Sequence, residues 1–215
     1  MSNTHTLPEQ PKQTPNLQLI KPISKPKSKI LFLGYSRQQT TLIDDLVSTN
    51  NEVWHTEESI SSTSGFDLVI SYGFRHILKR EVINSSPAPI INLHISYLPW
   101  NRGSHPNFWS FFECTPSGVS IHLLDEGIDT GPIIYQKYVN FTDDEKTFSQ
   151  TYNRLIIEIE NLFRSNIEQI VSKNFVAVPQ RRKGSYHRVS DLPQEFSGWN
   201  SDIHSEILKL DRILR

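Results

Sequence analysis

Short apolar runs that alternate with segments of helical periodicity constrain the fold of this 215-residue chain most strongly. Four early strands are expected, at residues 30–34, 52–55, 66–71 and 89–91. Continuous apolar runs are typical of strands buried on both faces, as in a parallel sheet. A helix is expected at residues 38–50, and a glycine turn at residues 72–78 leads into another helical segment. The alternation predicts an α/β fold: a Rossmann-like, mostly parallel sheet with flanking helices and right-handed crossovers.

The first strand ends in one glycine, Gly34, which is followed by Tyr35 and Ser36. A dinucleotide-binding turn needs three spaced glycines at this place, so we do not expect nicotinamide binding. Open α/β sheets bind ligands at the carboxyl ends of their strands. The ligand site is therefore expected near Gly34, the 72–74 turn and the polar residues that follow residue 91.

Asn92 and His94 follow the fourth strand, and their two-residue spacing places both side chains on one face. A polar and aromatic loop, residues 96–106, comes next and has the composition of a ligand-holding loop. Two further strands, at residues 118–124 and 133–141, flank a glycine-bounded turn and predict a β-hairpin. Asp129 in that turn can return a carboxylate to the strand end that carries His94.

Other polar residues have simpler interpretations. Asp125 and Glu126 suit turn geometry and solvent better than paired-carboxylate catalysis. His105, His122 and Cys114 include no close-spaced pair of metal ligands, so no metal site is expected.

The second half of the chain predicts helices. Thr142 and Glu145 resemble a capping box, and apolar residues from Phe148 to Ile170 recur at helical spacing, which predicts a long amphipathic helix. Residues 175–180 are expected to form a short strand or extended segment. Residues 201–215 are expected to form a short amphipathic helix.

Charge and apolar content bear on domains, partners and location. Residues 1–29 hold five lysines, one glutamate and five prolines, so this tail is near +4 and the remainder near −5 for a net charge of −1. We expect a disordered tail at 1–28, a catalytic domain at 29–187 and a C-terminal extension with a short helix at 188–215. A mildly acidic core argues against nucleic acid as a partner. No run is long enough to span a membrane and no secretory signal is visible, so we expect a cytoplasmic protein.

Three motifs together resemble the folate-dependent formyltransferases. The motifs are Asn92-Leu93-His94, Ser96-Tyr97-Leu98-Pro99 and Asp125-Glu126-Gly127-Ile128-Asp129-Thr130-Gly131. Their order and spacing are similar to the family's, and Pro179-Gln180 and Gly184-Ser185-Tyr186 extend the similarity to about residue 187. Within the family, residues 101–109 resemble most closely the enzymes that formylate an amino sugar carried on a nucleotide.

The resemblance implies the formyltransferase fold, with a hairpin after the catalytic loop, and a role in polysaccharide biosynthesis. It implies 10-formyltetrahydrofolate as formyl donor, a nucleotide-linked amino sugar as acceptor and no metal, and it allows for a homodimer. Chemistry then assigns Asn92 to the oxyanion, His94 to proton transfer and Asp129 to orienting the imidazole. Expected donor contacts are Tyr72, Gly73, Phe74, Arg75, Ile77, Leu78, Leu124, Asp125, Glu126 and Gly127. Expected acceptor contacts are Trp100, Arg102 and His105, because an arginine fits a phosphate.

Two alternatives remain open at this point. The acceptor could be glycinamide ribonucleotide, although the segment after Gly34 lacks that branch's glycine-rich phosphate loop. The chain could also be an inactive binding module of the same fold. A transfer-RNA acceptor is disfavoured, because few residues follow Tyr186 to form that branch's C-terminal barrel.

Overall fold

The computed structural model describes residues 16–214 and contains a seven-stranded mixed sheet. Its strands are β1 (Gln18–Leu19), β2 (Lys29–Gly34), β3 (Glu52–Thr56), β4 (Leu68–Tyr72), β5 (Ile90–His94), β7 (Gly118–Leu123) and β8 (Ile133–Tyr138). The order is β1-β3-β2-β4-β5-β7-β8, with β2 to β5 parallel and β1, β7 and β8 antiparallel to their neighbours. The predicted α/β class, with its β7–β8 hairpin, is confirmed.

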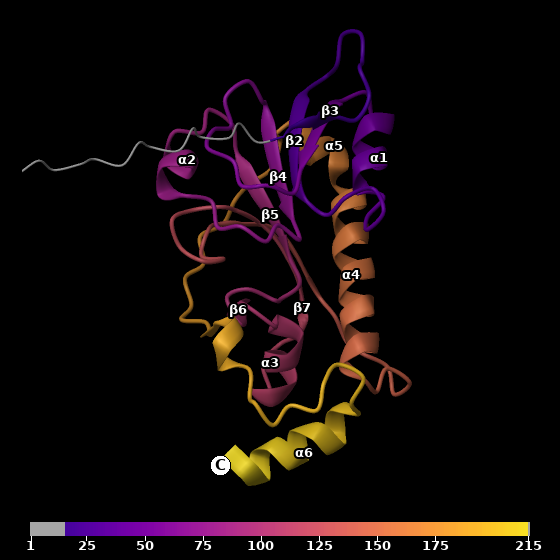
Figure 1. The fold of residues 1–215 in the computed structure, drawn as a ribbon, viewed down its shortest axis with the longest axis vertical. Helices are drawn as coiled ribbons and strands as arrows, with labels where there is room; N and C mark the ends of the chain where they lie inside the picture. The colour runs from indigo at the N-terminus through magenta and orange to yellow at the C-terminus, as the bar shows by residue number, and fades with distance from the viewer. Residues whose placement is uncertain (1–15, 215) are drawn as a thin grey trace, which may run out of the picture.

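Helices cover both faces of the parallel region (Figure 1). Helix α1 (Leu42–Ser48) and the long helix α4 (Phe148–Ser165) lie on one face, and the short helix α2 (Arg80–Asn84) lies on the other. Alternate residues of β2 serve the two cores: Ile30 packs under α1 and α4, whereas Leu31 belongs to the cluster on the α2 side. A strand buried on both faces needs such a continuous apolar run.

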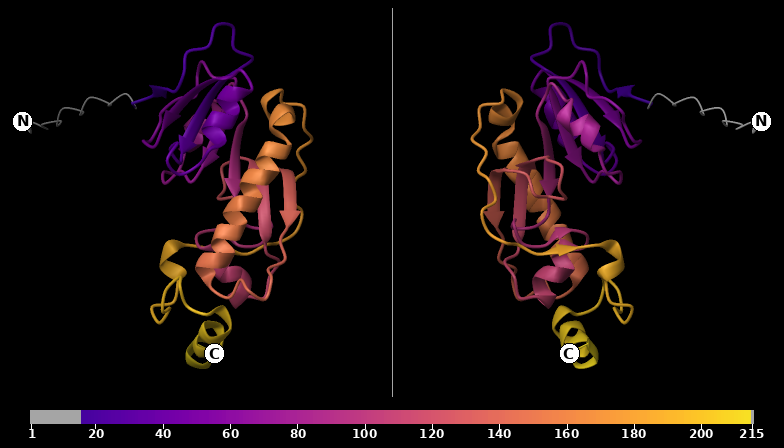
Figure 2. Two further views of the ribbon diagram at one scale, coloured as in Figure 1. Left: turned by 90° about the vertical axis from the view of Figure 1, so that its right-hand side faces the viewer. Right: turned by 90° about the vertical axis from the view of Figure 1, so that its left-hand side faces the viewer.

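The C-terminal extension packs at the far end of the molecule from the parallel strands (Figure 2). Helix α6 (Ile203–Leu214) joins helix α3 (Pro106–Phe112) and the start of α4 in a third apolar cluster, whose buried members are Phe108, Trp109, Phe148 and Leu210. The short helices α5 (Ile167–Val171) and η1 (Val189–Asp191) complete the helical elements of residues 16–214. Within this range no helix combines the length and apolar character that crossing a membrane requires.

A two-stranded ribbon ties residues 186–187 to the loop after β5. Strand β6 (Arg102–Gly103) pairs in parallel with β9 (Tyr186–His187). Gly184 lies against the loop so closely that a Cβ there would stand 1.6 Å from the carbonyl oxygen of Pro99. Only glycine fits this approach.

Two details differ from the sequence-based expectations. Disorder was predicted for residues 1–28, but Gln18–Leu19 pair with β3, and Leu17 and Ile20 pack against the two cores of the sheet. A two-residue strand is too short to show a period-two pattern, so the sequence did not reveal it. The remaining part of the predicted tail, residues 1–15, lies outside the described part of the chain. The segment 175–180 makes one isolated bridge, between Val178 and Ile133, and forms no regular strand, which agrees with the second of its two predicted alternatives, an extended segment.

The capping box also lies later than predicted. Thr147 and Gln150 form it at the start of α4, whereas Thr142 and Glu145 close a turn before the helix. Both pairs have the same Thr-x-x-Glu/Gln pattern, so sequence alone did not decide between them.

Candidate functional site

Asn92 and His94 lie at the carboxyl end of β5, on one side of the strand, as their spacing predicts. The antiparallel pairing of β5 with β7 places His122 directly opposite Asn92. The turn after β7 carries Asp129 back to both residues, so the structure brings an amide, two imidazoles and a carboxylate together.

Asp129 is the centre of this cluster. Its Oδ2 accepts a hydrogen bond from the Gly103 backbone N–H at 2.9 Å and lies 3.6 Å from Nε2 of His94. Its Oδ1 accepts from Nδ2 of Asn92 at 3.3 Å and lies 3.4 Å from Nε2 of His122. The backbone of Asp129 has φ +52°, a left-handed conformation that Asp and Asn tolerate better than most residues.

The burial of this cluster sets its charges. Burial alone would raise the pKa of Asp129, but electrostatic attraction from the two histidines and the hydrogen bond from the Gly103 N–H outweigh burial and hold that pKa well below its usual range. Burial lowers the pKa of His94, with a smaller contribution from His122, and outweighs the opposing attraction of Asp129. The cluster therefore combines an ionised carboxylate with a neutral His94 at neutral pH.

The hydrogen bonds assign the tautomers of both histidines. Nε2 of His94 faces two acceptors, the Asn101 carbonyl oxygen at 3.2 Å and Oδ2 of Asp129, so it carries the proton and Nδ1 keeps a lone pair. Nδ1 of His122 lies 2.8 Å from the Leu123 carbonyl oxygen and must donate to it. His122 can then accept a hydrogen bond at Nε2 from Nδ2 of Asn92, 3.3 Å away.

A cavity of about 400 Å³ opens onto Asn92, His94 and Asp129; we call it the strand-end cavity. Two exposed isoleucines border it, Ile77 at 81% exposure and Ile128 at 37%. Exposed apolar side chains beside a cavity are suited to covering a flat, aromatic ligand.

The predicted donor contacts divide between this cavity and other places. Gly73, Phe74 and Ile77 line the strand-end cavity. Tyr72 is a core residue whose ring packs edge-on against Tyr35, and Leu78 is buried in the cluster on the α2 side.

The turn residues Leu124 to Gly127 line neither the strand-end cavity nor the neighbouring cavity described below. Leu124 packs on the α2-side cluster, Asp125 accepts hydrogen bonds from Thr130 and Gly127, and Glu126 binds Arg80 and Asn84. The turn instead presents Ile128 and Asp129, because the contacts of Asp125 and Glu126 direct those carboxylates into the turn and toward α2.

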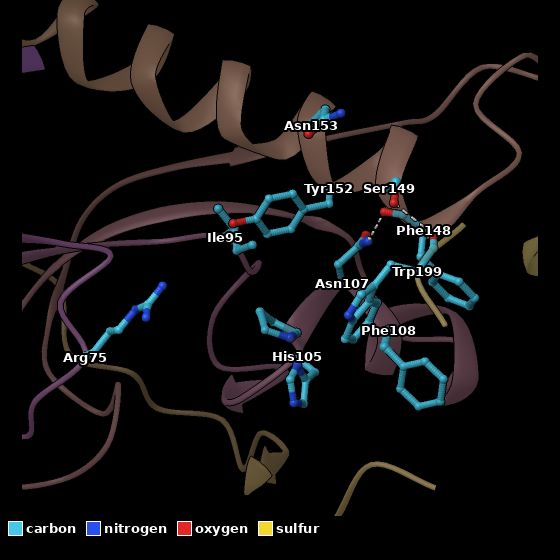
Figure 3. Close-up of a pocket in the computed structure, with 11 residues that line it drawn as sticks. Arg75, Ile95, His105, Asn107, Phe108, Phe148, Ser149, Tyr152, Asn153 and Trp199 are labelled. Atoms are coloured by element: carbon cyan, nitrogen blue, oxygen red, sulfur yellow. Dashed lines mark hydrogen bonds between the residues drawn. The ribbon is translucent and has the colours of Figure 1, made fainter. Parts of the chain in front are cut away.

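A second cavity, of about 700 Å³, adjoins the first and shares Ile95, Pro106 and Tyr152 with it (Figure 3). We call it the extension cavity, because Trp199 of the C-terminal extension forms part of its wall. Arg75, predicted as a donor contact, and His105, predicted as an acceptor contact, both line it.

Arg102 and Trp100 line neither cavity. The Arg102 guanidinium donates from Nε at 3.2 Å and Nη2 at 2.7 Å to Oε1 of Gln180. Gln180 in turn donates to the carbonyl oxygens of Asp129 at 2.9 Å and Gly131 at 2.7 Å. Arg102 thus supports the turn that carries Asp129, and its placement does not match the predicted phosphate contact.

Several residues of the strand-end cavity were missed from the sequence: His122 beneath it, and Tyr35, Tyr152, Tyr186 and His187 in its lining. His187 stacks on Trp109 with ring centres 3.8 Å apart and has Nε2 3.3 Å from Oε1 of Glu113. The sequence predicted a strand at residues 118–124 but not its register with β5, which places His122 opposite Asn92. Within residues 16–214, no group of three or more His, Cys, Asp or Glu side chains is arranged to hold a metal ion.

Comparison with known proteins gives a consistent result. The sequence profile of the formyl transferase family matches residues 38–165. Two curated relatives are methionyl-tRNA formyltransferases: that of Thermodesulfovibrio yellowstonii is 36% identical over 109 residues, and that of Clostridium botulinum is 28% identical over 185 residues. The matches cover 47% and 84% of this chain but only 35% and 60% of the relatives' own lengths.

A solved structure resembles most of the chain. It is the formyltransferase PseJ from Anoxybacillus kamchatkensis, in complex with UDP-4,6-dideoxy-4-formamido-L-AltNAc and tetrahydrofolate. The two are 38% identical with a TM-score of 0.75, and the match covers 82% of this chain and 96% of PseJ.

Proposed function

The chain belongs to the formyl transferase family, and we propose that it transfers a formyl group from 10-formyltetrahydrofolate to the amine of a nucleotide-linked amino sugar. The observation that supports this acceptor most is the similarity to PseJ, which extends over 96% of that chain. Methionyl-tRNA formyltransferase relatives are matched over a smaller share of their length, 35% and 60%.

The strand-end cavity fits a folate donor. Phe74, Ile77 and Ile128 provide apolar surface beside the polar cluster, and both isoleucines are exposed. Apolar walls next to a few placed polar groups are the usual composition of a site for a flat heterocycle. When bound, 10-formyltetrahydrofolate supplies the formyl group.

The side chains of the cluster have complementary roles in this reaction. Asn92 donates a hydrogen bond to the oxygen that becomes negative when the amine attacks the formyl carbon. Its two acceptors, Oδ1 of Asp129 and Nε2 of His122, each lie 3.3 Å from Nδ2 and are only 3.4 Å apart, so one amide hydrogen can serve both while the other is directed to the substrate. His94 accepts the amine proton at Nδ1, and Asp129 stabilises the imidazolium across 3.6 Å. The bond between the formyl carbon and N10 of the donor then breaks, and tetrahydrofolate leaves with a proton returned from His94 to that nitrogen.

A second candidate function is formylation of methionyl-tRNA, because both curated relatives carry that name. The same cluster would serve that acceptor, so the chemistry does not separate the two functions. The acceptor must be tested directly.

The test combines the full chain with 10-formyltetrahydrofolate and a panel of acceptors. The panel holds nucleotide-linked amino sugars that differ in sugar and base, glycinamide ribonucleotide and methionyl-tRNA. Tetrahydrofolate release and the mass of the N-formyl product are followed. We expect formylation of at least one nucleotide-linked amino sugar and neither of the other acceptors. Turnover with methionyl-tRNA or glycinamide ribonucleotide alone would replace this proposal, and no turnover with any acceptor would favour a binding module.

A further inference from the structure

The extension cavity is built from three distant parts of the chain. Arg75 follows β4, His105 precedes α3, and Trp199 comes from the C-terminal extension. Its shared wall of Ile95, Pro106 and Tyr152 connects it to the strand-end cavity, where the polar cluster lies. A ligand held at the cluster can therefore continue into the extension cavity.

Trp199 is held firmly in this wall. Its carbonyl oxygen accepts hydrogen bonds from the backbone N–H of Ser149 at 2.8 Å and from Oγ of Ser149 at 3.1 Å. A backbone bond of 2.8 Å from Ile203 to Lys146 fixes the next part of the extension to the start of α4. These bonds fix the backbone of Trp199, and the rings of Phe148 and Phe196 pack against the indole, so little ordering entropy opposes its contact with a ligand.

Trp199 is also an available aromatic surface. Its side chain is 41% exposed, although the rings of Phe196 and His105 lie with centres 4.8 Å and 5.2 Å away. Burial lowers the pKa of His105, which favours an uncharged ring beside the indole. A nucleobase stacks well on such a surface, because every base has a π face.

The electrostatic character of the extension cavity suits an anion. Arg75 is exposed and contributes a permanent positive charge, whereas the described lining residues include no carboxylate. An arginine in a concave site can hold two phosphate oxygens at once. Figure 3 shows Arg75 at one end of the cavity and Trp199 and Phe148 at the other, with His105 and Tyr152 between them.

We propose that the extension cavity binds the nucleoside diphosphate part of the acceptor, with the diphosphate at Arg75 and the base against Trp199. This inference rests on the proposed function and deepens it, because it makes the C-terminal extension part of the acceptor site. The amino sugar then reaches the polar cluster through the shared wall. Trp199 and Arg75 become specificity residues that act on binding and take no part in the chemistry.

Calorimetric titration of the full chain with UDP, uridine and tetrahydrofolate tests this site. Four variants are compared: Trp199→Ala, Trp199→Phe, Arg75→Ala and Leu208→Ala. Leu208 is the control, because it is 44% exposed on α6 and lines neither cavity. Melting temperatures are measured in parallel, since Trp199→Ala could loosen the extension.

We expect Trp199→Ala to raise the Kd of UDP and of uridine by roughly 5- to 100-fold, the range for a lost base–aromatic stack. Trp199→Phe should retain most of the affinity. Arg75→Ala, at an exposed position that is safe for folding, should weaken UDP about tenfold or more and leave uridine unchanged. Tetrahydrofolate should bind all four variants as it binds the parent chain.

Unchanged UDP affinity in Arg75→Ala and in folded Trp199→Ala would overturn the proposal. Weakened tetrahydrofolate with UDP unaffected would assign the cavity to the donor and overturn it as well. If these dependences appear but no nucleotide-linked amino sugar is formylated, the proposed function fails and this site stands. If such a sugar is formylated with an unchanged KM in both variants, this site is wrong and the proposed function stands.

Discussion

Asn92 and His122 face each other across β5 and β7, and Nδ2 of Asn92 lies 3.3 Å from Nε2 of His122. Because Nδ1 of His122 donates to the Leu123 carbonyl oxygen, Nε2 is left to accept a hydrogen bond from the amide. This contact fixes which end of the Asn92 amide points toward Asp129. The donor proposed for the oxyanion is therefore oriented before any ligand arrives.

Replacing Asn92 by Ala should lower kcat by roughly 10²- to 10³-fold and leave donor binding nearly unchanged, because an oxyanion donor acts mainly in the transition state. Steady-state kinetics and a tetrahydrofolate titration of the same preparation check this. A change confined to KM would assign Asn92 to ground-state binding.

Activity should depend on pH through His94. Burial lowers the pKa of His94 below its ordinary value of 6.5, so the neutral base persists into mildly acidic solution. The acid limb of the kcat/KM profile should therefore lie below pH 6.5. Activity that already falls between pH 8 and pH 7 would contradict a neutral, buried His94.

Stability should fall in acid for two reasons of the same sign. Because folding lowers the pKa of His94, the neutral imidazole makes its full contribution to stability above pH 6.5. That contribution is lost as the pH falls through the folded-state pKa. Because folding also lowers the pKa of Asp129, its ionised carboxylate makes its full contribution to stability above pH 3.8, and that contribution is lost at still lower pH. Urea unfolding from pH 8 to pH 2.5 should show decreasing stability below pH 6.5 and a further decrease below pH 3.8. For Asp129→Asn the part due to Asp129 should be absent.

Arg102 and Gln180 should behave as one unit. Arg102→Ala and Gln180→Ala should each lower kcat, because each releases the turn that carries Asp129. The double variant should be no worse than the more damaging single one, since contacting residues are not additive. A double-mutant cycle on kcat measures this coupling. Additive losses, or a rise in acceptor KM for Arg102→Ala alone, would restore Arg102 as a direct ligand contact.

The segment around β1 should contribute to stability. A chain that begins at residue 29 should melt roughly 3–8 °C below one that begins at residue 16, because Leu17 and Ile20 lose their partial burial. Comparing these two truncations by calorimetry isolates the segment from residues 1–15. Equal melting temperatures would show that the β1 contacts are energetically neutral.

The parallel sheet could be predicted from the sequence because its signal is local. The run from Ile30 to Leu33 is buried at every position, which a strand with one wet face does not allow. Asn92 and His94 share a strand end by simple period-two geometry. Asp129 could be placed only because the turn before β8 is short and bounded by glycines.

What could not be predicted depends on contacts between distant segments. His122 meets Asn92 only through the β5–β7 register, and Gln180 reaches Arg102 across 78 positions of sequence. Trp199 lines the extension cavity because α6 packs on α3. The helical periodicity of α6 predicts an apolar face but not the helix on which that face packs. An arginine in a ligand-like loop predicts a charge but not its partner, and this is why Arg102 was assigned to a phosphate.

The Asp129→Asn variant tests the account's central claim, that the cluster at the end of β5 performs the chemistry. Asn also tolerates the φ of +52° at this position, and its side-chain oxygen can still accept from the Gly103 N–H. The turn is therefore kept while the charge near His94 and His122 is removed. We predict a kcat lower by roughly 10²- to 10⁴-fold in a protein that still folds cooperatively but melts below the parent chain, because the stabilising ionised carboxylate is lost. Full activity in a folded Asp129→Asn protein would reduce Asp129 to a turn residue and contradict the proposed mechanism.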